Sequence, residues 1–218
     1  MFKQILYTQW KWTRLPLLFL ALGAFALPFL SAQAVRPSFG GFWDTQRILE
    51  SIQGLGVFYP ALAGALGLMV AMATWAPDHR GRHVYALSLP TPRWHYAMLR
   101  FAAGALLLLV PVLALWVASL LASLGTTLPP GVRAYPTMLT IRFDLAALLA
   151  YAIFFAISAG TSRTAGYILG IIAAVVVVQI FASLLDVQLR ILESALNQIY
   201  IWPGPLEIFT GRWMLFDV

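Results

Sequence analysis

Five long apolar stretches dominate the sequence and limit the folds open to it. They cover residues 15–34, 55–77, 97–124, 143–161 and 165–185. Such stretches match the roughly 20 residues that a helix needs to cross the hydrocarbon core of a bilayer. Hydrophobic residues make up 61% of the chain and charged residues only 10%, too few charges to cover a water-soluble domain. We therefore predict an all-α polytopic integral membrane helical bundle with five spans, forming a single transmembrane domain over residues 1–218.

Several shorter segments accompany the predicted spans. Residues 1–14 place apolar side chains on one helical face and lysines elsewhere, which favours a helix on the cytoplasmic surface. Amphipathic patterns near 44–55 and 187–202 are too short to span and indicate interfacial or re-entrant helices, the second within an outer-face segment, 186–218. Ala32-Gln33-Ala34 is also typical of a signal cleavage site, but we expect the first stretch to be a retained span.

The connecting segments favour a cytoplasmic N-terminus. In that orientation the inner segments carry eight of the 14 Lys and Arg residues, and Asp78 is the only one of eight acids inside. Positive charge gathers in the cytoplasmic loops of membrane proteins. The net charge of +6 therefore indicates inner loops and anionic headgroups, and no nucleic-acid partner is expected.

Small residues recur at helical spacing within the spans. Gly64 and Gly67 lie one turn apart, and Gly166-x-x-x-Gly170 is followed by Ala174. Small side chains allow membrane helices to approach closely. We expect these positions to pack against neighbouring helices.

One polar segment between the second and third spans stands out, DHRGRHVYALSLPTPRWHYAMLR, from Asp78 to Arg100. We expect Asp78 to cap a helical turn, the HVYALSL run to form a short helix, and Pro90 and Pro92 to end it before Arg93 opens the next span. Topology alone accounts for the positive charge of a solvated inner loop. A short apolar helix, however, needs cover from lipid headgroups or from a partner protein.

The pattern D-H-R-G-R-x-x-x-A-L-S-L-P-x-x-R resembles the first intracellular loop of permease subunits in ABC transporters of the type-2 exporter class. The residues at matching positions are Asp78, Gly81, Leu87, Leu89, Pro90 and Arg93, whereas Arg82 replaces the threonine usual in that family. The order of the spans, the surface helix before the first span, and WPGPLEIFTGRW near the end extend the resemblance over most of the chain.

The resemblance implies that residues 78–93 form a coupling loop docked on a separate nucleotide-binding ATPase subunit. In this interpretation Arg80 and Arg82 pair with acids of the ATPase, and Tyr85 and Leu87 are apolar anchors. The full set of coupling residues is Asp78, Arg80, Gly81, Arg82, Tyr85, Leu87, Leu89, Pro90 and Arg93.

The resemblance also implies partners and a location. These are a second permease subunit, identical or related, membrane lipids, and the bacterial cytoplasmic (inner) membrane. ATP and Mg²⁺ would be bound by the partner ATPase, and no cofactor by this chain. The family has a sixth span after the outer helices, and the 218-residue sequence contains none.

Other chemistries find little support in the sequence. It contains no G-x-x-x-x-G-K-[ST] motif for nucleotide phosphates and no cysteine. The predicted spans lack the central carboxylates, histidines and lysines of proton relays, which disfavours a secondary transporter. We interpret Gln179, the most polar residue deep in a span, as an interhelical hydrogen-bond partner.

Catalysis and metal binding are not expected either. Ser158 and Ser162 have no histidine in any predicted span to activate them. His79 and His83 stand four apart, but Asp78 is the only acid nearby, so no metal site is predicted. The alternative to a permease is a non-transporting scaffold or anchor subunit of a larger membrane complex, which explains the spans and basic loops equally well.

Overall fold

A computed structural model of the chain describes residues 1–34, 54–80, 92–128, 132–160, 162–184, 204 and 206–217. Five long helices account for most of this part of the chain: α1 (Phe2–Ala34), α3 (Phe58–Arg80), α5 (Arg93–Leu124), α6 (Pro136–Ser158) and α7 (Ser162–Leu184). A short strand, β1 (Arg133–Ala134), lies between α5 and α6. The 3-10 helix η1 (Glu207–Phe209) and a second short strand, β2 (Phe216–Asp217), come after α7. The predicted all-α class is confirmed.

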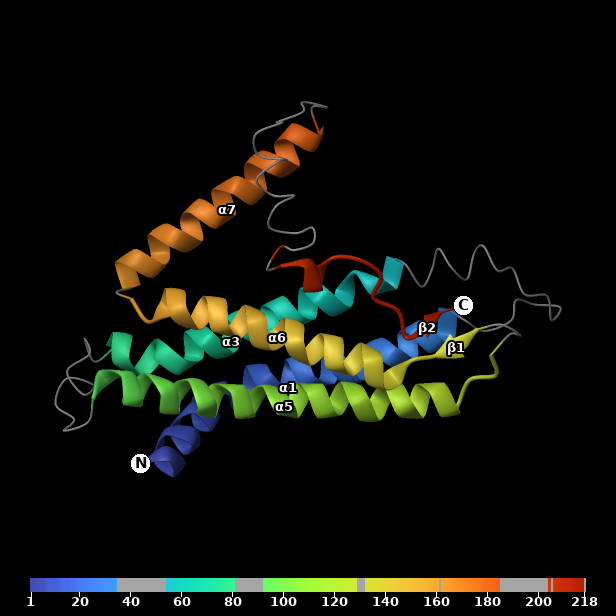
Figure 1. Ribbon diagram of the computed structural model, residues 1–218, viewed down its shortest axis with the longest axis horizontal. Helices are drawn as coiled ribbons and strands as arrows, with labels where there is room; N and C mark the ends of the chain where they lie inside the picture. Colours follow the sequence, from blue (N-terminus) through green and yellow to red (C-terminus); the bar gives the residue numbers. More distant parts are fainter. Residues whose placement is uncertain are drawn as a thin grey trace.

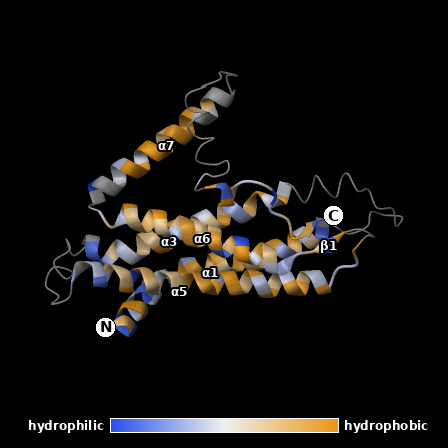
Figure 2. Ribbon diagram, viewed as in Figure 1, coloured by the Kyte–Doolittle hydropathy of each residue, from blue (hydrophilic) through white to orange (hydrophobic). Residues whose placement is uncertain are grey.

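Four of these helices, α1, α3, α5 and α6, are long and apolar enough to cross a membrane. The chain is therefore a multi-pass membrane protein, and Figure 2 shows hydrophobic residues along all four helices. In α7 the apolar stretch found among the described residues is Gly166–Val178, which is shorter than a span. The fifth span stays a prediction.

Several helix boundaries differ from those expected. The predicted surface helix and first span form one helix, α1, which contains Pro16. Figure 1 shows its first turns bending away from the rest, and we attribute this bend to the proline. Helix α6 begins at Pro136, seven residues before the predicted span. Proline suits the first position of a helix because no intrahelical partner is needed for its missing N–H.

The four spanning helices lie side by side in Figure 1. Helix α1 packs mainly on α5 and α3 mainly on α6, and α5 also contacts α6. Leu66, Leu108, Leu115 and Phe143 are among the fully buried side chains of this core. Helix α7 contacts α6 but extends away from the bundle (Figure 1).

The C-terminal segment closes the end of the bundle where α6 begins. Strand β2 pairs antiparallel with β1, just before α6. Arg142 of α6 donates hydrogen bonds to the carbonyl of Ile208 at 3.2 Å, to that of Arg212 at 2.7 Å and to that of Thr210. Three backbone acceptors thus satisfy a cation about two turns inside the helix, which explains how α6 can include an arginine that precedes the predicted span. The predicted helices at 44–55 and 187–202 fall almost entirely outside the described residues.

Close packing of α3 on α6 depends on Gly67. A Cβ atom added there would lie 2.5 Å from the Cβ of Ala150 and 2.5 Å from the backbone nitrogen of Tyr151. In the part of the chain that the structure describes, nothing lies within 4 Å of a Cβ atom added at Gly64, Gly166 or Gly170. The expectation of close contact is therefore confirmed at Gly67 alone among these glycines.

Gly67→Ala should lower the free energy of unfolding by about 1–3 kcal/mol, because the new methyl group forces the α6 backbone to move. Gly64→Ala is the matched control and should leave stability unchanged or slightly raised. Thermal unfolding of both variants in detergent measures the difference. Equal midpoints for the two variants would contradict the close α3–α6 contact.

Candidate functional site

A buried ion pair joins the two helices on either side of the basic segment. Asp78 lies in the last turn of α3 and Arg100 about two turns into α5. The Nη1 atom of Arg100 is 3.0 Å from Oδ2 of Asp78, and its Nη2 atom donates to Oδ1 at 3.1 Å. The side chain of Arg100 is only 8% exposed and that of Asp78 only 2% exposed. This two-point geometry is the strong form of an arginine–carboxylate contact.

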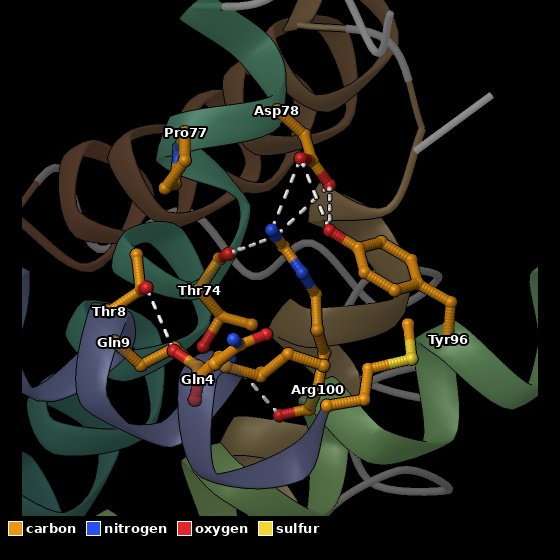
Figure 3. A pocket seen from close by; sticks show the side chains of 10 residues that line it. Gln4, Thr8, Gln9, Thr74, Pro77, Asp78, Tyr96 and Arg100 are labelled. Atoms are coloured by element: carbon orange, nitrogen blue, oxygen red, sulfur yellow. Dashed lines mark hydrogen bonds and ion pairs between the residues drawn. The ribbon is translucent and has the colours of Figure 1, made fainter. Parts of the chain in front are cut away.

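The surroundings of the pair satisfy most of its remaining hydrogen-bonding capacity. The hydroxyl of Tyr96 lies 3.4 Å from each carboxylate oxygen of Asp78, and Nη1 of Arg100 donates to the carbonyl of Thr74 at 2.5 Å. The guanidinium also lies over two aromatic rings, 5.3 Å from the centre of Trp75 and 4.8 Å from that of Tyr96. Figure 3 shows Asp78, Tyr96 and Arg100 converging on one point.

The other two spanning helices reach the same place. Gln9 of α1 donates through Nε2 to the carbonyl of Arg100 at 3.3 Å. The hydroxyl of Tyr151, from α6, lies 3.2 Å from the carbonyl of Phe101, and the two rings stack with centres 5.0 Å apart. The stretch of α5 around Arg100 is therefore where polar contacts link all four helices.

This arrangement corrects one expectation. Asp78 does not cap a helical turn of the following loop, because it belongs to α3 and its carboxylate binds Arg100. A buried carboxylate needs a cation close by to remain charged in apolar surroundings. Arg100 supplies it, and the contact joins the last turn of α3 to the first two turns of α5. These two helix ends are the stems of the loop.

The other predicted coupling residues stand at or beyond these stems. Arg80 is the last residue of α3 and Arg93 the first residue of α5. The remaining six, Gly81, Arg82, Tyr85, Leu87, Leu89 and Pro90, lie outside the described residues.

Asp78 was predicted as a site residue, but its partners Arg100 and Tyr96 were not, nor was Gln9, which donates to the carbonyl of Arg100. The sequence did contain a usable signal for the pairing of Asp78 with Arg100. An acid in the last turn of one span and an arginine near the start of the next lie at the same end of two antiparallel helices. The distant Gln9 had no such signal, because its contact joins residues 91 positions apart.

Comparison with known proteins assigns no family. No protein-family model, curated protein or solved structure matches the chain. Among the residues that the structure describes, no three metal-binding side chains come together.

Removing either partner of the pair should destabilise the fold strongly. Arg100→Met or Asp78→Leu alone leaves an unpaired buried charge and should lower the free energy of unfolding by about 3–5 kcal/mol. The double variant should recover most of that loss, because both charges disappear together. Denaturant unfolding of the four proteins measures the coupling.

Arg14→Met is the control, since Arg14 is exposed on α1; its loss should cost little. Single effects that simply add in the double variant would show that the two side chains do not interact.

Proposed function

We propose that the chain is the membrane-spanning permease subunit of an ATP-driven ABC exporter. A separate subunit would hydrolyse ATP, and this chain would convert the resulting movement of that subunit into movement of its own helices. The observation that carries the proposal is the buried Asp78–Arg100 pair between the stems of the loop. A loop whose two stems are fixed to each other moves α3 and α5 together when a partner pushes on it.

Further features support this proposal. The stems end and begin with arginines, Arg80 and Arg93, and cationic side chains at a protein interface favour an acidic partner surface. The sequence pattern from Asp78 to Arg93 resembles the coupling loop of type-2 exporter permeases. In the proposed arrangement the N-terminus is cytoplasmic and the membrane is the bacterial cytoplasmic membrane. A second permease subunit would complete the pathway, and the chain itself has no catalytic role.

The alternative is a non-transporting anchor or scaffold subunit. The spans and their packing suit it equally well. It gives no reason, however, for a loop with an ordered pattern of glycine, leucines and prolines between two stems joined by a buried ion pair. We therefore rank the permease first.

Arg80→Glu combined with Arg82→Glu should release the ATPase. Reversed charge at an interface costs several kcal/mol, so the ATPase that co-purifies in mild detergent should fall at least about tenfold. Quantitative mass spectrometry of the purified complexes measures this ratio. Circular dichroism should show unchanged helix content, because Arg80 is the last residue of α3 and Arg82 comes after it in the sequence.

The double variant Lys3→Glu with Lys11→Glu is the matched control. It makes the same change in charge on α1, at the same end of the bundle, and should keep the ATPase bound. An ATPase retained at wild-type stoichiometry by the loop variant would contradict the assignment of these arginines. A wild-type chain that purifies with no nucleotide-binding partner would favour the anchor.

A further inference from the structure

Asp144 is an acidic residue inside a spanning helix. It lies at the start of the span predicted from the sequence, but α6 begins at Pro136, so about two turns of helix come before it. It follows Arg142 by two residues, or about 3 Å along the helix axis, and no charged residue comes after it in α6. Asp144 therefore lies at the border between the polar contacts of Arg142 and the apolar part of the span. Ionisable residues within spans are costly and are usually functional.

The carboxylate of Asp144 is unpaired and accessible. In the part of the chain that the structure describes, it makes no hydrogen bond and no ion pair, whereas the other acid of the four spanning helices, Asp78, binds Arg100. Asp144 is partly exposed, and its oxygen atoms are not among the buried unpaired atoms of the described residues. A ligand can therefore reach this carboxylate without a change in the packing of α6.

The helix surface around Asp144 has a packed side and an open side. Thr140 and Ala147, about one turn away in either direction, are buried. Ile141, also about one turn away, is 51% exposed, and the adjacent Leu145 is 49% exposed. The accessible carboxylate thus borders an apolar surface that faces away from the bundle, towards the surrounding membrane.

A ligand that suits this place carries a positive charge next to an apolar chain. Arg142 does not supply the charge, because each of its three nitrogens donates to a backbone carbonyl. An ammonium group donates charge-assisted hydrogen bonds to a carboxylate, and an apolar chain bonded to it would cover Ile141 and Leu145. The ammonium of an ethanolamine phospholipid suits the place less well, since the phosphate beside it would come close to the carboxylate and repel it.

We propose that Asp144 binds the ammonium group of a cationic amphiphile, a molecule in which the charged nitrogen is bonded directly to an apolar chain. The ammonium donates to the Asp144 carboxylate, and the chain lies along the open side of α6 within the apolar layer of the bilayer. The ligand reaches the site sideways from the membrane, near the end of the bundle where α6 begins. This binding site does not depend on the proposed transport function.

The test compares a charged probe with an uncharged probe of the same chain length. The full-length protein is placed in nanodiscs of choline phospholipid with equal small amounts of octadecylamine and octadecanol, extracted gently at pH 7, and analysed by native mass spectrometry. One hydrogen bond to a charged group corresponds to about a tenfold preference, so the amine should be retained about tenfold over the alcohol. The net charge of +6 repels amines from the chain as a whole, so this preference requires a specific site.

Three variants identify the carboxylate responsible. Asp144→Asn keeps the size of the side chain and should abolish the preference, whereas Asp144→Glu keeps the acid and should retain it. Glu207→Gln is the matched control and should also retain it, because it removes the same charge from the C-terminal segment at the same end of the bundle. Because the measurement is a ratio of two ligands within one sample, reduced stability of a variant does not imitate the result.

Several outcomes would overturn the proposal. Equal retention of the amine and the alcohol by the wild-type protein would mean that a proton or another protein chain satisfies Asp144. An amine preference that survives Asp144→Asn would place the binding site elsewhere. Displacement of the amine by an equal amount of ethanolamine phospholipid would assign the site to an ordinary lipid headgroup.

Discussion

The buried contact between Asp78 and Arg100 is the interaction on which the rest of this structure depends. In an apolar environment neither charge is tolerable alone, since each needs compensation that water would otherwise provide. Their pairing allows both charges to be buried between the last turn of α3 and the early turns of α5. The contacts of Gln9 and Tyr151 with the backbone around Arg100 then bring α1 and α6 to the same point.

A second arginine organises the opposite end in a different way. Arg142 donates to three backbone carbonyls of the C-terminal segment, and the carboxylate of Glu207 in that segment also acts on its charge. Gly211 lies in this segment with a φ of 79°, a left-handed conformation that a side chain would disfavour. One end of the bundle is therefore joined through a pair of charges on adjacent spans. The other is joined through hydrogen bonds from Arg142 to the backbone of the C-terminal segment. In the proposed function, force enters at the first of these ends.

The sequence predicted the architecture better than it predicted the contacts. Long apolar stretches require spanning helices whatever their neighbours are, so four spans followed from length and composition. Helix ends were less predictable, and α6 begins seven residues before the predicted span. Arg142 belongs to α6 since distant carbonyls satisfy it, and no local pattern reveals those carbonyls. Asp78 was identified as important, but its partner and its burial depend on how two helices meet.

The central claim is that the ion pair holds the stems of the loop at one separation. The chain has no native cysteine, so spin labels at Arg80→Cys and Arg93→Cys report this distance without background. Pulsed electron paramagnetic resonance should give a narrow distance distribution, which broadens when Arg100→Met is added. A label pair at the far ends of the same helices, Phe58→Cys with Leu124→Cys, should not change. A distribution that is already broad with Arg100 present, or one that stays narrow without it, would contradict the account.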